Sequence, residues 1–206
     1  MSPRVNPQYK EKRRSAILAA AKRVFTEKGY HRARMQDILV EAGISRGALY
    51  AYFDNIEHVY QEVLKLEDEL DIGPFENEDG LSCREQLFGW IRMQQRRIGS
   101  DDHAFLLSKT EYFISKSQEA GRPADPYIKQ RYERLAASIE QCIQTGIDKK
   151  EFDPTAAPGA IALYVLSFLD GLLLDTFNLG TEATKADEQI DIFIVALSRI
   201  LGSENQ

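Results

Sequence analysis

The chain has 206 residues, 43% of them hydrophobic, which is enough for one ordinary globular domain or for a small module joined to a larger one. No stretch reaches the roughly 18 uninterrupted apolar residues of a membrane span, and the basic start "MSPRVNPQYKEKRR" has no apolar segment behind it. We therefore expect a soluble cytoplasmic protein with no membrane partner. Cys83 and Cys142 have no CxxC partner, which fits unpaired packing thiols in a reducing compartment.

The net charge of −6 hides a division along the chain. Residues 1–53 hold 11 Lys and Arg against 4 Asp and Glu, a net of +7, while the remaining residues hold 15 against 28, a net of −13. A basic module ahead of an acidic body is typical of a nucleic-acid reader with a separate second domain, because phosphate binding needs local positive charge. The alternative is a solvated helix face on which basic residues happen to cluster.

Apolar residues at helical spacing predict four helices in the first third of the chain. The first passes through Ile17 and Phe25 and ends at Gly29. The second covers about 35–42, and the third runs from the N-cap Ser45 to about Phe53. A fourth helix, about 56–71, ends at "DIGPFENEDG", where glycine, proline and acidic residues predict the domain boundary.

Helical patterns continue to the C-terminus, and no alternating strand pattern appears. They predict a long helix through 128–146 and two apolar helices over about 156–178 and 187–202. We expect an all-α protein with a basic N-terminal domain in residues 1–56, a connecting helix in 57–72 and a second helical domain in 73–206. One chain cannot easily bury both apolar C-terminal helices, so they predict a homodimer through a two-fold four-helix bundle.

The second and third helices, joined by the short glycine-containing turn "EAGIS", have the spacing of a helix-turn-helix, whose second member can enter the major groove of DNA. Leu49 and Phe53 are expected to hold this helix on the other two. Residues left outside would meet DNA: base edges near the helix start, and phosphates through tyrosine hydroxyls. This set is Ser45, Arg46, Gly47, Tyr50 and Tyr52. Taken alone, the aromatic residues could equally be core residues of a helical bundle.

Residues 17–64 resemble the DNA-binding segment of the tetracycline-repressor (TetR) family of bacterial transcriptional regulators. The resemblance rests on Gly29-Tyr30, Asp37-Ile38, Ala42 to Ser45, and Leu49-Tyr50-x-Tyr52-Phe53 at the family's spacings. It implies that Ser45, Arg46 and Gly47 face bases and that Tyr50 and Tyr52 contact the DNA backbone. It also implies that residues 1–56 form a helix-turn-helix DNA-binding domain and that 73–206 form a ligand-binding and dimerisation domain. The resulting dimer would bind an inverted-repeat operator in double-stranded DNA and be released by a small apolar or amphipathic effector.

Two positions depart from the family pattern. Ala33 and Arg34 replace the usual hydroxyl pair before the second helix, which puts its capping in doubt, and Arg34 is expected to restore a phosphate contact through its charge. Ile56 replaces the lysine often found before Glu57, so one phosphate contact is missing.

Catalysis has no support in the sequence. The three histidines are scattered, and there is no HExxH motif, phosphate loop or GxSxG elbow. We expect neither an enzyme nor a bound cofactor or metal.

The second domain offers candidates for an effector pocket, each of which could equally be an ordinary core residue or, for the glutamate, a solvated one. They are Trp90, Met93, Phe105, Glu111, Tyr112, Phe113 and Tyr127. Asp170 and Asp175 interrupt the apolar helix 156–178 and are expected to be paired or exposed, because an unpaired buried carboxylate is costly.

Overall fold

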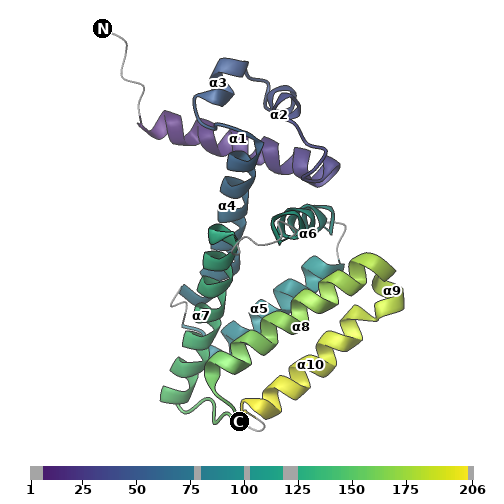
Figure 1. Cartoon of the computed structure of the whole chain (residues 1–206). Helices are drawn as coiled ribbons and strands as arrows, with labels where there is room; N and C mark the ends of the chain where they lie inside the picture. Colours follow the sequence, from purple (N-terminus) through teal and green to yellow (C-terminus); the bar gives the residue numbers. More distant parts are fainter. Residues whose placement is uncertain (1–6, 77–79, 100–102, 118–124, 204–206) are drawn as a thin grey trace. The chain divides into compact units, whose positions relative to one another are not determined.

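A computed structural model describes residues 7–76, 80–99, 103–117 and 125–203. Within these ranges the chain forms ten helices and no strand (Figure 1), so the predicted all-α class is confirmed. The contacts divide the chain into two compact units, which are described separately.

Unit 1 consists of the described residues within Met1–Asp68 and Ala104–Asp125. It holds α1 (Pro7–Lys28), α2 (Met35–Ala42), α3 (Arg46–Tyr50), most of α4 (Ile56–Glu76) and nearly all of α6 (His103–Ser117). Its core is a set of apolar side chains with at most 4% of their surface exposed: Ile17, Leu18, Ala21, Val24, Phe25, Ile38, Leu49, Phe53, Val59, Tyr60, Val63 and Leu64. The predicted α1, α2 and α4 are present, but two of their ends differ from the prediction. Helix α1 begins ten residues before Ile17, and α4 continues past residue 71, through Pro74, to Glu76.

The apolar residues that recur at helical spacing along α4 are only partly buried. Val59 and Val63 are buried, but Leu66 and Leu70 are 45% and 58% exposed. The buried face moves around the helix, so that Asp68 and Ile72 are covered further along. A single periodic stripe could not reveal this change, because α4 runs from unit 1 into unit 2 and has different neighbours in each.

Unit 2 consists of the described residues within Glu69–His103 and Pro126–Gln206. Its helices are α5 (Cys83–Gly99), α7 (Pro126–Asp148), α8 (Pro158–Leu179), α9 (Thr181–Thr184) and α10 (Ala186–Ile200). Helix α8 packs on α7, α5 packs on α7 and α10, and the short α9 joins α8 to α10 (Figure 1). These contacts enclose one apolar core that includes Leu87, Ile91, Ile139, Ile143, Val165, Ile190 and Leu197.

Helix α8 is long and apolar enough to cross a membrane by length and composition alone. Seven of its residues, from Ile161 to Thr176, are buried within unit 2, as in the core helix of a bundle. The opposite side carries exposed apolar residues, and Asp170 and Asp175 lie exposed among them, as expected.

Candidate nucleic-acid interface and effector site

The turn between α2 and α3 is built by backbone hydrogen bonds and one serine. Gly43 adopts a left-handed conformation with φ of 62°, and its N–H donates to the carbonyl of Val40 at 3.2 Å. The N–H of Ile44 donates to the carbonyl of Leu39 at 3.2 Å. Ser45 then caps α3, because its Oγ accepts a hydrogen bond from the N–H of Ala48 at 3.3 Å. Glycine suits position 43 because L side chains adopt this conformation at a cost.

Helix α3 is held by its buried face. Leu49 and Phe53 have at most 1% of their surface exposed, as expected. Among the residues predicted to meet DNA, Ser45, Arg46, Gly47 and Tyr50 are exposed, whereas Tyr52 is half-buried. The Arg46 guanidinium lies 5.3 Å from the centre of the Tyr50 ring. This cation–π contact positions a planar five-donor group at the start of the helix, where it can meet a guanine edge or a phosphate.

The N-cap residue of α2, Arg34, makes no side-chain cap hydrogen bond, and the start of the helix is instead held by the carboxylate of Asp37, at the third helical position. Oδ2 of Asp37 accepts a hydrogen bond from the N–H of Arg34 at 2.8 Å, while Oδ1 accepts one from Lys28 Nζ at 2.7 Å. The hydrogen bond from Lys28 lowers the pKa of the Asp37 carboxyl. Nη1 of Arg34 donates to the carbonyls of His31 and Ala33 at 2.8 and 3.1 Å. The doubt about capping is thus answered by Asp37, while the phosphate contact of Arg34 stays a prediction.

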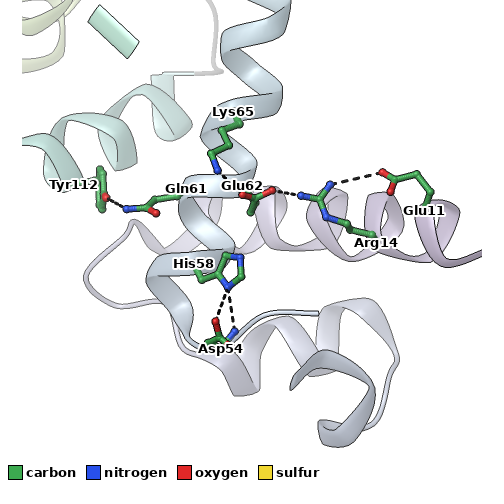
Figure 2. Close-up of polar contacts among 8 residues, drawn as sticks. All are labelled: Glu11, Arg14, Asp54, His58, Gln61, Glu62, Lys65 and Tyr112. Atoms are coloured by element: carbon green, nitrogen blue, oxygen red, sulfur yellow. Dashed lines mark hydrogen bonds and ion pairs between the residues drawn. The ribbon is translucent and has the colours of Figure 1, made fainter. Parts of the chain in front are cut away.

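The beginning of α4 is tied to the rest of unit 1 by polar contacts (Figure 2). Asn55 Oδ1 accepts a hydrogen bond from the N–H of His58 at 2.8 Å, and His58 Nδ1 lies 3.2 Å from Asp54 Oδ2. One turn later, Glu62 forms an ion pair with Arg14 of α1, whose guanidinium also approaches Glu11. Helix α4 therefore supports the base of the helix-turn-helix through both apolar and charged contacts.

Helix α6 packs within the same unit as the helix-turn-helix. Oε2 of Glu111 accepts hydrogen bonds from the N–H groups of Tyr30 and His31 at 2.8 and 3.4 Å. Tyr112 is fully buried, and its hydroxyl accepts a hydrogen bond from Gln61 Nε2 at 2.8 Å (Figure 2). Its ring centre lies 4.9 Å from that of Tyr30 and 5.0 Å from that of Tyr60. These contacts fix α6 against the turn that follows α1.

The candidate effector residues therefore fall into two groups. Phe105, Glu111, Tyr112 and Phe113 belong to unit 1, and Trp90, Met93 and Tyr127 belong to unit 2. Trp90 is buried, with its Nε1 donating to the carbonyl of Asp71 at 2.9 Å and its ring centre 5.5 Å from that of Phe75. Met93 packs against the core of unit 2. Their role toward a ligand stays a prediction.

Unit 2 also contains a half-open cavity of about 740 Å³ that the sequence did not indicate. It lies among the end of α4, the start of α5 and one side of α7, and none of the candidate effector residues lines it. Its walls mix apolar and polar groups: Phe75, Glu76, Gly80, Leu81, Cys83, Gln86, Arg134, Ala137, Ser138, Gln141, Cys142, Thr145 and Lys149. Arg134 is held there by Glu69 and Glu76 at 2.6 and 3.3 Å.

Both cysteines at this cavity are free and buried, which confirms the expected unpaired thiols. Cys142 Sγ donates weakly to the carbonyl of Cys83 at 3.5 Å. Burial raises the pKa of the Cys142 thiol to about 12. Because the thiolate is the reactive form, Cys142 is a packing group at neutral pH.

Comparisons with known proteins agree with this geometry. Residues 17–63 match the sequence profile described as "Bacterial regulatory proteins, tetR family", and residues 86–187 match that of the "Tetracyclin repressor-like, C-terminal domain". The HTH-type transcriptional regulator YfiR of Bacillus subtilis is 30% identical over 189 residues, which cover 91% of this chain and 90% of YfiR.

Solved structures share the fold. GusR of Salmonella enterica has a TM-score of 0.74 at 20% identity, with 97% of this chain and 98% of GusR covered. SmeT, the repressor of the SmeDEF multidrug efflux pump of Stenotrophomonas maltophilia, has a TM-score of 0.71 at 17% identity, with 90% of this chain and 88% of SmeT covered. SmeT has also been solved as a complex with triclosan.

Proposed function

This chain belongs to the TetR family of bacterial transcriptional regulators, and we propose that it is a cytoplasmic repressor whose dimer leaves its operator when a small molecule binds. The observation that carries the DNA-binding part is α3 itself. Its buried Leu49 and Phe53 fix the helix, and Ser45, Arg46 and Gly47 at its start are exposed. A Cβ atom at position 47 would meet no protein atom within 4 Å, so the space beside the Gly47 backbone is open to a DNA groove.

The dimer is supported by the outer faces of α8 and α10. These helices carry large apolar side chains with 44% to 69% of their surface exposed: Leu163, Tyr164, Leu174, Phe177, Leu179, Ile192 and Val195. So many exposed apolar side chains on two helices are unfavourable in water and mark an association site. Pairing α8 and α10 with the same helices of a second copy forms a two-fold four-helix bundle that covers it.

The two-fold axis sets the form of the operator. Each protomer presents one α3 to the major groove, so the preferred site is an inverted repeat whose half-sites lie roughly 34–36 Å apart or at a multiple of that spacing. In this arrangement Ser45, Arg46 and Gly47 contact bases. Tyr50 and Tyr52 contact the DNA backbone, as does Arg34 if its guanidinium leaves the two carbonyls of its own loop.

The effector is an apolar or amphipathic small molecule that binds in unit 2. The 740 Å³ cavity has the size and mixed lining of a small-molecule site, with Phe75 and Leu81 as apolar contacts and Gln86 and Gln141 as hydrogen-bonding groups. Trp90, Met93 and Tyr127 provide the alternative pocket lining in the same unit, where Trp90 is part of the apolar core and Met93 packs against it.

Helix α4 provides the physical link between ligand and DNA. Its last turn contributes Phe75 and Glu76 to the cavity, and its first turns are bonded to α6 through Gln61 and to α1 through Glu62, within the unit that holds the helix-turn-helix. A ligand that displaces the end of α4 changes the separation of the two α3 helices without blocking any base contact. With coupling of about 1–3 kcal/mol, operator affinity falls roughly 5- to 150-fold.

Linkage provides the test. Small molecules are screened for a rise in the melting temperature of the protein, since a ligand that prefers the folded state raises it by mass action. The best ligand is then titrated into free protein and into the operator complex. We expect operator DNA to lower the affinity of the protein for the ligand by the same factor by which the ligand lowers its affinity for the operator. Equal ligand affinities in both titrations would exclude a ligand-released repressor.

A further inference from the structure

The basic residues of α1 differ in whether they form ion pairs within the protein. From Arg14 onward each one forms an ion pair: Arg14 with Glu62, Lys22 with Glu67 at 2.8 Å, Arg23 with Glu41 at 2.6 Å, and Lys28 with Asp37 at 2.7 Å. Before Arg14, no carboxylate of the described residues pairs with Lys10, Lys12 or Arg13. The fold thus neutralises the positive charge of the body of α1 and leaves it unbalanced on the first turns.

Burial of apolar side chains does not explain why α1 extends over these first turns. Residues 8–16 of α1 are exposed or half-buried, and Ile17 is the first buried residue after them. Helix α1, which begins at Pro7, thus extends by roughly 15 Å before Ile17. Tyr9 is 55% exposed, and its hydroxyl lies 3.4 Å from Nη1 of Arg13. A projecting cationic helix with few burial contacts is better explained by an external partner than by the stability of unit 1.

Helical periodicity places part of this charge on the side that carries the helix-turn-helix. Residues 4, 7 or 11 positions apart share a face. Tyr9 and Arg13 therefore lie on the same face as Ala20, which is buried in the core of unit 1. Lys12 lies on the same face as Arg23, which pairs with Glu41 of α2. Figure 1 shows α2 and α3 on the same side of α1. Lys10 instead shares the face of Arg14, which pairs with Glu62 of α4.

We infer that Tyr9, Lys12 and Arg13, here called the α1 basic surface, form a second DNA contact that binds phosphates outside the bases contacted by α3. Duplex DNA carries one negative charge per about 1.7 Å of its axis, so a projection of about 15 Å faces several phosphates. Lysine and arginine neutralise phosphates without reading sequence, and the tyrosine hydroxyl can donate to a phosphate oxygen. This surface adds affinity and salt dependence to the operator complex and leaves base preference to α3.

The inference rests on the proposed DNA-binding function, and its test separates the two. Lys12→Gln, Arg13→Gln and their double variant are prepared in the full chain, since glutamine keeps a helix propensity close to that of lysine and arginine. Lys10→Gln is the matched control, because it removes the same charge from the same turn on another face. Each protein binds its selected operator and an unrelated duplex over a range of salt concentrations.

For each phosphate contact removed, the slope of log K against log salt becomes shallower by about 0.9. We expect a change of about 1.8 per dimer for each single variant and about 3.6 for the double variant, on both duplexes and with unchanged base preference. Lys10→Gln is expected to keep the wild-type slope.

Four results would overturn the inference. Unchanged slopes in the double variant, next to normal operator binding by the wild type, would reject the α1 basic surface and leave the proposed function intact. A changed base preference would show that these residues read sequence. Loss of binding to vesicles containing anionic lipid, with DNA binding unaltered, would assign the surface to a membrane. Absence of wild-type DNA binding at low salt would reject both proposals.

Discussion

The carboxylate of Glu111, in the middle of α6, accepts a hydrogen bond from the backbone N–H of Tyr30, 81 residues earlier in the chain, at 2.8 Å. Tyr30 follows Gly29, which ends α1 in a left-handed conformation with φ of 75°. The carboxylate lies so close that a Cβ at position 29 would be 2.7 Å from Glu111 Oε2. One side chain of α6 therefore satisfies the backbone N–H of Tyr30 in the turn that follows α1.

This relationship can be measured with a double-mutant cycle. Glu111→Ala is expected to lower the free energy of unfolding by about 1–2 kcal/mol, because the N–H of Tyr30 loses a charged acceptor. Gly29→Ala is expected to cost more in the wild type than in the Glu111→Ala background, since the left-handed strain remains in both but the crowding against the carboxylate is gone. Urea unfolding of all four proteins measures the difference. Glu133→Ala, at an exposed site on α7, serves as the control, and strict additivity of the two substitutions would contradict the contact.

Substitutions in α3 should separate base reading from backbone binding. Arg46→Ala is expected to relax base preference at one position of each half-site, at a cost of about 1–3 kcal/mol if Arg46 makes a bidentate guanine contact. Tyr52→Phe removes only a hydroxyl and is expected to lower the affinity for all DNA duplexes about equally. Competition binding on operators with single base changes measures both. A base-dependent effect of Tyr52→Phe, or a uniform effect of Arg46→Ala, would reverse the two roles.

The exposed apolar face of α8 gives a prediction about assembly. Leu174 is 44% exposed on this face, and Leu174→Arg places a charge where the second copy would pack. We expect the wild type to sediment as a dimer at micromolar concentration and the variant to sediment mainly as a monomer. Leu66→Arg, at a residue of α4 that is 45% exposed, should leave the dimer intact. A monomeric wild type would refute the proposed bundle.

The cap of α2 gives a prediction about pH. The pKa of Asp37 is lowered in the folded protein, chiefly by the hydrogen bond from Lys28, so folding favours the charged carboxylate. Its stabilising contribution is complete above the unfolded pKa of about 4 and is lost as the pH falls through the lower folded value. Asp37→Asn should therefore destabilise the protein at pH 7 more than at pH 3 in urea unfolding. Lys28→Gln should remove most of that pH dependence, and its persistence would assign the effect to another group.

The features that could be predicted from the sequence are those that depend on residues a few positions apart. The turn at Gly43, the cap at Ser45 and the buried pair Leu49 and Phe53 each follow from residue types a few positions apart, and all are present in the structure. Contacts between distant segments could not be predicted in this way. Glu111 was expected to line an effector pocket or to be solvated, and no residue near it in the sequence indicates that its carboxylate accepts a hydrogen bond from Tyr30.

The same limit applies to the effector site. The aromatic residues of 90–127 were candidates for one pocket of the second domain, yet they belong to two units. The 740 Å³ cavity is lined by α4, α5 and α7 residues without a common motif, so only the fold brings Phe75, Gln86 and Gln141 together. Capping of α2 by Asp37 could have been expected, since an acidic residue at the third helical position is a known partner for the N-cap backbone.

Selection of binding sites from random duplex DNA by the full-length protein tests the central claim most directly. A dimer that presents two α3 helices is predicted to enrich an inverted repeat, with half-sites roughly 34–36 Å apart or at a multiple of that spacing. Its binding should weaken steeply with salt, because phosphate contacts release counterions. Enrichment of a single asymmetric sequence, or no enrichment at low salt, would contradict the account of this protein as a dimeric operator-binding regulator.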